Sequence, residues 1–190
     1  MTIQESKRRQ RADGIAARCA LEAGSRDAMN HRIAQRVLAM PEFQRAQVLF
    51  SYCAMRGEVD SSEIEAEARR MGKCIAYPVC CGNGRMIAAV PDSRENMHRG
   101  MYGASEPLPG HYSILSPEQI DLVLVPCTAF DHRCLRVGMG GGYYDRYLRL
   151  CSGGRFVALA YEVQKVCFAA AEEHDLFLHA VATESALYQL

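Results

Sequence analysis

The residues best suited to chemistry form one stretch, 136–146, with the sequence R-V-G-M-G-G-G-Y-Y-D-R. Its four glycines allow positive φ angles and a close backbone approach to a ligand, and successive N–H groups in such a loop can bind an anion. A helix starting at Gly142 would add its free N–H groups and positive dipole end. Arg136 offers a planar cation for phosphate oxygens, and Asp145 offers a hard oxygen ligand for Mg²⁺ carried by a triphosphate. The stretch predicts a nucleoside triphosphate site.

A glycine-rich turn before a helix is the alternative interpretation of this stretch. The loop is not G-x-G-x-x-G, because Tyr143 occupies the place of the third glycine, and G-x-x-x-x-G-K-[ST] occurs nowhere in the chain. Glycines alone would favour the simple turn. Arg136 before them, with Tyr143, Tyr144 and Asp145 after them, favours the phosphate site.

Strands and helices alternate along the chain, which predicts an α/β fold with a largely parallel sheet. The run 122–125 is wholly apolar, as in a strand buried on both faces. Gly24 is expected to end the first helix and Ser25 to cap the second. The first helix should bury Ala12, Ile15, Ala16 and Cys19. The predicted helices are 4–22, 26–40, from the cap at 60–62 to 71, 143–151 and 163–173, and the predicted strands are 46–53, 73–79, 85–90, 122–125, 155–161 and 178–183, with 91–117 mostly loop.

Two of the predicted strands lead into loops that could form a site. Ligands of parallel α/β sheets bind outside the carboxyl ends of the strands. The loop after strand 46–53 contains Glu58, and the loop after strand 122–125 contains the glycine cluster. If these strands run parallel, both loops open on the same edge of the sheet.

Length and charge exclude several classes of protein. The 190 residues favour a single domain, 1–190. The 22 basic residues balance 22 acidic ones, whereas nucleic-acid binders usually have a basic surplus. No apolar stretch approaches the ~18 residues of a membrane span, and no apolar segment follows the basic N-terminus as in a signal peptide. The nine cysteines include no C-x-x-C pair and are interpreted as reduced, mostly buried thiols of a cytoplasmic protein.

The motif P-C-T-A-F-D at 126–131, followed by the glycine stretch, resembles the signature of the 5-formyltetrahydrofolate cyclo-ligase family. Weaker agreements are Lys7-x-x-x-Arg11, residues 55–58 and Gly103-x-x-Glu106-Pro107, so the resemblance covers nearly the whole chain. It implies a three-layer Rossmann-like sandwich with helices flanking the sheet. It also implies a monomeric, ATP- and Mg²⁺-dependent enzyme that converts 5-formyltetrahydrofolate to 5,10-methenyltetrahydrofolate, without nucleic-acid or membrane partners.

The resemblance also implies the roles of individual residues. Arg136 and Tyr143 would act in catalysis, and Asp145 would hold Mg²⁺. The folate would contact Cys53, Met55, Glu58 and Tyr143. ATP would contact Lys7, Arg11, Arg136, Gly138, Met139, Gly140, Gly141, Gly142, Tyr143 and Tyr144.

Alternatives remain for residues outside the glycine stretch. Lys7 and Arg11 lie four apart on one helix face and could form a solvated basic surface. Glu58 could be a surface carboxylate, and Cys53 and Met55 could be core residues. Some family members have a lysine at the position of Gly141 and a second metal-binding aspartate at that of His179. A non-catalytic nucleotide- or folate-binding relative, or an ATP-dependent enzyme with another carbonyl substrate, would share most of these features.

Overall fold

The computed structural model describes residues 2–173 and 175–190. Its centre is a sheet with the strand order β12-β11-β10-β7-β1-β2-β3-β6. Two small sheets accompany it: β4 (Met97–Arg99) pairs with β5 (Ser105–Pro107), and β8 (Ala129–Phe130) pairs with β9 (Arg136–Val137). The strands of the large sheet are β1 (Val48–Phe50), β2 (Cys74–Cys80), β3 (Met86–Pro91), β6 (Tyr112–Leu115), β7 (Leu122–Pro126), β10 (Arg155–Leu159), β11 (Ala180–Ala182) and β12 (Leu187–Gln189).

The five middle strands of the large sheet, β11, β10, β7, β1 and β2, run parallel, whereas β12, β3 and β6 pair antiparallel. The sheet is therefore largely parallel, as predicted. Leu49 and Phe50 of β1 lie beside Leu122 and Val123 of β7 in parallel register. The loops that follow β1 and β7 consequently leave the sheet at the same edge, where the sequence predicts the site.

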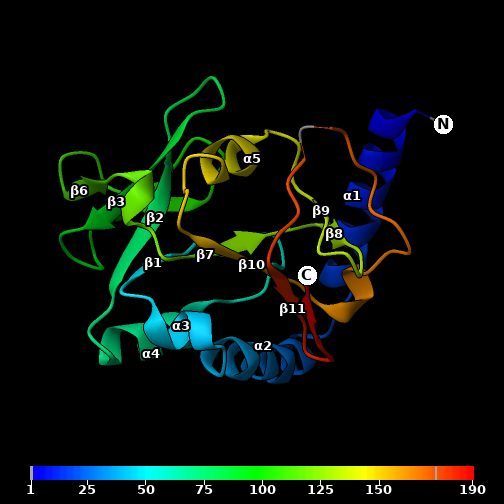
Figure 1. Cartoon of the computed structure of the whole chain (residues 1–190), viewed down its shortest axis with the longest axis horizontal. Coiled ribbons are helices and arrows are strands. Elements are labelled where there is room, and N and C mark those ends of the chain that lie inside the picture. Colours follow the sequence, from blue (N-terminus) through cyan, green and yellow to red (C-terminus); the bar gives the residue numbers. More distant parts are fainter. Residues whose placement is uncertain (1, 174) are drawn as a thin grey trace.

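Helices cover both faces of the sheet unequally (Figure 1). One face is covered by α2 (Ala23–Leu38), α3 (Pro41–Arg45) and α4 (Ser62–Arg70), and the other by the short α5 (Tyr143–Leu148). The first helix, α1 (Ile3–Cys19), stands at one end of the molecule against the β8–β9 hairpin. The predicted helix–sheet–helix layering is present, with most of the helical cover on one side.

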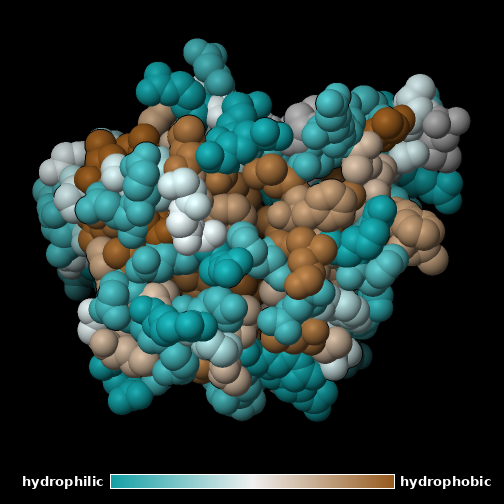
Figure 2. Space-filling view, viewed as in Figure 1, coloured by the Kyte–Doolittle hydropathy of each residue, from teal (hydrophilic) through white to brown (hydrophobic). Residues whose placement is uncertain are grey.

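The core lies on both faces of the sheet. In β7, Leu122 and Leu124 pack under α2 and α4, whereas Val123 and Val125 pack on the side of α5. All four side chains are fully buried, which confirms the prediction from the apolar run. The surface is mixed, and Figure 2 shows apolar side chains gathered at the height of α5 among hydrophilic ones. Within the described residues, no helix has both the length and the apolar character needed to cross a bilayer.

The structure corrects the predicted boundary between the first two helices. Gly24 does not end a helix, and Ser25 does not cap one, because α2 begins at Ala23 with Glu22 as its N-cap. The break comes earlier, after Ala20. Gly24 has no positive φ, and no neighbour lies within 4 Å of its Cβ position, so it adopts the helical conformation that glycine tolerates at a modest entropic cost.

The predicted buried face of the first helix is also wrong. The buried residues of α1 are Lys7, Gly14 and Arg18, whereas Ile15 is only half-buried and Cys19 is exposed. Periodicity selects the most apolar side of a helix. Here the covered side is polar, because α1 packs against loops and a hairpin instead of an apolar sheet face.

The region 91–117, predicted to be mostly loop, is so, but it also contains the short strands β4, β5 and β6. One further segment differs from the prediction. The predicted helix 163–173 is absent, and only a 3₁₀ turn, Glu162–Gln164, forms there. The backbone N–H groups that follow this turn donate to distant acceptors instead. Val166 N donates to Phe130 O at 2.8 Å, and Ala169 N donates to the Asp131 carboxylate at 3.0 Å. Such tertiary partners satisfy the backbone without a helix.

The cysteines are free, as predicted, but they are not mostly buried. Three of them are exposed, three are half-buried and three are buried. In that order they are Cys19, Cys81 and Cys167, then Cys53, Cys74 and Cys80, then Cys127, Cys134 and Cys151.

Candidate functional site

The glycine loop joins the β8–β9 hairpin to α5. Gly140 and Gly142 adopt positive φ angles of +97° and +64°, a region that residues with a Cβ rarely enter. Gly142 is the N-cap of α5 in the left-handed conformation. The helix predicted to begin there is present but has six residues, shorter than expected, so the glycine loop itself provides most of the backbone available to a ligand.

Arg136 and Asp145, on either side of the glycine loop, form an ion pair. Arg136 Nη1 donates to Asp145 Oδ1 at 2.9 Å, and the Arg136 side chain is nearly inaccessible, whereas that of Asp145 is 23% exposed. Arg136 Nε is buried without a hydrogen-bond partner among the described residues. Such an orphaned donor is costly unless an acceptor meets it, so the guanidinium is suited to donate to an anionic ligand.

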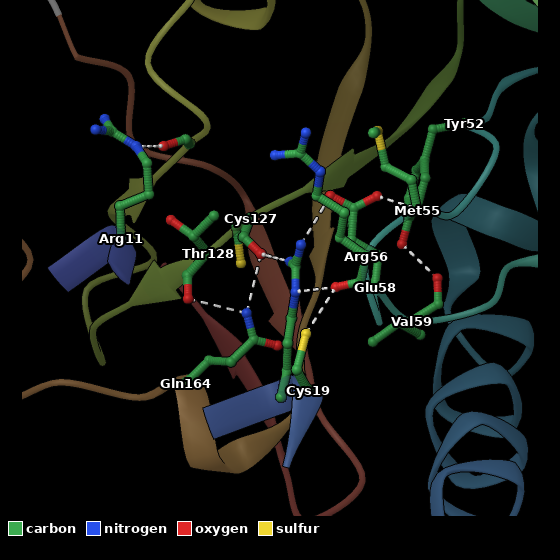
Figure 3. Close-up of polar contacts among 12 residues, drawn as sticks. Arg11, Cys19, Tyr52, Met55, Arg56, Glu58, Val59, Cys127, Thr128 and Gln164 are labelled. Atoms are coloured by element: carbon green, nitrogen blue, oxygen red, sulfur yellow. Dashed lines mark hydrogen bonds and ion pairs between the residues drawn. The ribbon is translucent and has the colours of Figure 1, made fainter. Parts of the chain in front are cut away.

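Arg11 reaches the same loop from α1. Its Nε donates to the Gly138 carbonyl at 2.7 Å (Figure 3), and its guanidinium carbon lies 3.1 Å from where a Cβ on Gly140 would stand. Two cations, Arg11 and Arg136, therefore flank the glycine loop. The structure brings together the parts of the predicted phosphate site that lie far apart in the sequence.

Lys7 lies one turn before Arg11 and has carboxylate partners. Lys7 Nζ lies 2.7 Å from Glu172 Oε2 and 2.5 Å from Asp175 Oδ2. Burial lowers the pKa of Lys7, but hydrogen bonds and charge from Asp175 and Glu172 outweigh this and raise it overall. Lys7 is therefore a buried, ion-paired residue and does not belong to a solvated basic face.

The residues predicted to contact folate lie in the loop after β1. Glu58 is buried, with 6% of its side chain exposed, and its Oε2 accepts from Met55 N at 3.1 Å (Figure 3). Burial raises the pKa of Glu58, whereas the charge of Arg18 lowers it. Glu58 is thus a held, buried carboxylate, which excludes the surface alternative. Cys53 and Met55 are half-buried, and Cys53 also packs against the core under α2 and α4, so for Cys53 the alternative of core packing stays open.

Tyr144, in α5, has a buried hydroxyl close to charged groups of both loops. Its hydroxyl is buried and has no hydrogen-bond partner among the described residues. Burial and the nearby Glu58 raise the pKa of Tyr144, whereas Arg136 lowers it. The charges of Glu58, in the loop after β1, and of Arg136, beside the glycine loop, therefore both act on the Tyr144 hydroxyl.

The β4–β5 hairpin adds residues to which the sequence assigned no role. The hydroxyls of Tyr102 and Tyr143 are 2.7 Å apart, and their rings meet edge to face with centroids 5.4 Å apart. Glu106 is buried and accepts from Cys80 N at 3.3 Å. The only sequence signal for this hairpin was the short Gly103-x-x-Glu106-Pro107 agreement.

His179 does not take part in this site. Its Nδ1 accepts from Phe156 N at 3.0 Å, and its ring packs against Phe156. Burial lowers its pKa. No group of three potential metal ligands occurs among the residues that the structure describes. Mg²⁺ that arrives on a triphosphate needs only one or two protein carboxylates, and the partly exposed Asp145 fits that mode.

The comparisons with known proteins agree on one family. The sequence model of the 5-formyltetrahydrofolate cyclo-ligase family matches residues 3–184. The 5-formyltetrahydrofolate cyclo-ligase of Escherichia coli (strain K12) is 29% identical over 178 residues, covering 90% of this chain and 97% of that protein. The Mus musculus 5-formyltetrahydrofolate cyclo-ligase is 27% identical over 204 residues, covering 97% and 96%. The solved structure of Aquifex aeolicus 5,10-methenyltetrahydrofolate synthetase matches with a TM-score of 0.84 at 27% identity, covering 97% of this chain and 92% of that chain.

Proposed function

This chain belongs to the 5-formyltetrahydrofolate cyclo-ligase family, and we propose that it converts 5-formyltetrahydrofolate to 5,10-methenyltetrahydrofolate at the expense of ATP. The formyl group on N5 is amide-like, so its carbon is a poor electrophile and its oxygen a poor leaving group. Transfer of the γ-phosphoryl group of ATP to that oxygen makes the carbon more electrophilic and the oxygen a better leaving group. N10 then attacks the formyl carbon and loses its proton, and the oxygen leaves as part of inorganic phosphate, with ADP as the other product.

The observation that supports this proposal best is the convergence of Arg11 and Arg136 on the glycine loop. Arg11 is bonded to Gly138, and the buried Arg136 Nε lacks a partner among the described residues. Phosphoryl transfer needs positioning and charge stabilisation more than covalent chemistry from the protein. Two guanidinium groups beside a glycine backbone provide both, because each can donate to phosphate oxygens with fixed geometry.

The proposed binding roles divide between the glycine loop and the loop after β1. The glycine loop, with Arg11 and Arg136, binds the triphosphate, and Asp145 holds its Mg²⁺, which neutralises charge on the transferring group. Lys7 lies on the same helix as Arg11. It contacts the phosphates if bound ATP replaces Glu172 and Asp175 as its partner. Tyr143 and Tyr144 border both reactants.

On the folate side, Glu58 accepts hydrogen bonds from the N–H groups of the pterin ring. Its burial supports this role, because a carboxylate shielded from water forms stronger hydrogen bonds with a ligand. Cys53 and Met55, which are partly covered and lie in the same loop, contact the ring system. Burial raises the pKa of Cys53 to about 11, so its thiol stays protonated and contributes packing instead of nucleophilic chemistry.

The test is to mix purified protein with 5-formyltetrahydrofolate, Mg²⁺ and ATP and to follow the near-ultraviolet band of the methenyl product. We expect the band to grow only when ATP is present, with phosphate released in equal amount. A folded protein that binds ATP but yields no band would refute the cyclo-ligase proposal. That result would favour a non-catalytic relative or another carbonyl substrate.

We also propose that the enzyme acts as a cytoplasmic monomer of one domain, residues 1–190, on small molecules without nucleic-acid or membrane partners. The balanced charge supports the absence of nucleic-acid binding. A single sheet that takes strands from residue 48 to residue 189 supports the single domain. Light scattering of the purified protein tests the oligomeric state.

A further inference from the structure

A fully buried arginine lies beneath the proposed folate site. Arg18, near the end of α1, is 1% exposed and is among the largest completely buried side chains. Arginine is almost never buried to this extent unless its charge and donors are matched. The guanidinium has three partners: Nε donates to Arg56 O at 3.0 Å, Nη1 to Cys127 O at 3.0 Å, and Nη2 lies 3.4 Å from Glu58 Oε1.

These partners belong to two loops that leave the sheet side by side. Arg56 and Glu58 follow β1, and Cys127 follows β7, its parallel neighbour. Figure 3 shows Arg56, Glu58 and Cys127 gathered around one cluster of polar contacts. Gln164, also buried, donates to the same Cys127 carbonyl at 2.9 Å. The Cys127 carbonyl is thus held by two buried donors, Arg18 and Gln164. Arg18 links this carbonyl to the Glu58 carboxylate.

We propose that Arg18 is a positioning residue for folate recognition, which holds the Glu58 carboxylate in the orientation that binds the pterin N–H groups. The inference rests on the proposed function. Arg18 does not touch substrate, because its three bonds turn toward the protein. Glu58 Oε2 is fixed by Met55 N and Oε1 by Arg18, so both oxygens have a set direction before the ring arrives. A preorganised acceptor avoids the cost of ordering on binding.

The charge of Arg18 matters as much as its geometry. Burial raises the pKa of Glu58, and the charges of Arg18 and Arg56 oppose that rise. The other titratable groups facing Glu58 are Tyr52, whose hydroxyl donates to Val59 O, with Tyr144 and Cys127. Burial raises the pKa of each of these three, so they stay neutral near pH 7. Removing Arg18 therefore leaves Arg56 as the opposing charge and increases the protonated fraction of Glu58.

Two substitutions of Arg18 separate the effect of charge from that of shape. Arg18→Gln removes the charge but keeps an N–H donor, whereas Arg18→Lys keeps the charge with fewer bonds. The KM for 5-formyltetrahydrofolate is measured from pH 6 to pH 9 in the full chain, with circular dichroism as the folding control. We expect Arg18→Gln to raise this KM about tenfold or more at pH 7. As the pH rises, the KM of this variant should fall back toward the wild-type value, because Glu58 then ionises. Arg18→Lys should keep the pH profile of the wild type.

The double-mutant cycle with Glu58→Gln decides between positioning and general support of the fold. If Arg18 acts through Glu58, neither Arg18 variant raises the folate KM further in the Glu58→Gln background. Additive effects, or an Arg18→Gln variant with an unchanged KM, would overturn the inference. If Arg18→Gln does not fold, the cycle with Arg18→Lys makes the same distinction. A wild-type protein without the methenyl band refutes the proposed function and this inference together, whereas an active wild type with an additive cycle refutes this inference alone.

Discussion

Replacing Gly14 with alanine should force α1 away from the segment that leads to the glycine loop. A Cβ on Gly14 would stand 1.9 Å from the carbonyl oxygen of Thr128 and 2.9 Å from its carbonyl carbon. Both are backbone atoms, so no rotation of a side chain relieves the overlap. Overpacking costs about 1–3 kcal/mol, and the better helix propensity of alanine offsets about 1 kcal/mol. With so short an approach, the cost of overpacking should reach or exceed the top of its range. After the offset from helix propensity, the free energy of unfolding should fall by about 2 kcal/mol.

Thermal unfolding measures this loss, with a second glycine as the matched control. At about 2–4 °C per kcal/mol for a chain of this size, the melting temperature of Gly14→Ala should fall by about 4–8 °C. Gly24→Ala in α2 meets nothing within 4 Å and should leave the melting temperature unchanged or slightly higher. The KM for ATP should rise in Gly14→Ala, because α1 carries Arg11 away from Gly138. Equal melting temperatures for the two variants would refute the close-packing argument.

Three other predictions concern the site and its support. Arg136→Ala and Asp145→Ala should each lower kcat about 100-fold or more with a folded circular dichroism spectrum, and wild-type turnover in either would contradict the glycine-loop assignment. Tyr144→Phe removes a buried hydroxyl without a partner among the described residues, so the melting temperature of this variant should not fall. Its KM for ATP or folate should rise. A marked loss of stability would show instead that the hydroxyl supports the fold. Burial raises the pKa of Asp131, but hydrogen bonds from Arg133 and backbone N–H groups outweigh it and hold the pKa below its usual 3.8. The contribution of Asp131 to stability is therefore present above pH 3.8 and is lost as pH falls through the folded-state pKa. In urea unfolding, Asp131→Asn should have a lower free energy of unfolding than the wild type at pH 7, and that free energy should decrease less between pH 5 and pH 2.

The sequence was most informative where local chemistry and local structure coincide. The glycine stretch predicted a loop with positive φ angles, and Gly140 and Gly142 adopt them. The apolar run 122–125 predicted a strand buried on both faces, and β7 is one. In both cases the relevant interaction, a backbone conformation or an alternating pair of buried faces, is encoded by adjacent residues.

Prediction failed where a distant segment decides the outcome. The first helix buries Lys7, Gly14 and Arg18 instead of Ile15 and Cys19, because its neighbours are polar loops and a backbone carbonyl that only glycine accommodates. The segment 165–173 remains irregular because distant acceptors such as the Asp131 carboxylate satisfy its N–H groups. Neither feature leaves a periodic trace in the chain itself.

The sequence by itself determined the family, the parallel α/β layout and the conformation of the glycine loop for which we propose phosphate binding, because these depend on residue types at fixed short spacings. Only the tertiary structure decided how the site is assembled. It joins Arg11 to Gly138 and brings the Tyr144 hydroxyl under the charges of both Arg136 and Glu58. It also buries Arg18 beneath the Glu58 carboxylate. The reason is physical: burial and charge pairing depend on which loops meet at one edge of the sheet, and that meeting is set by strand order and helix packing.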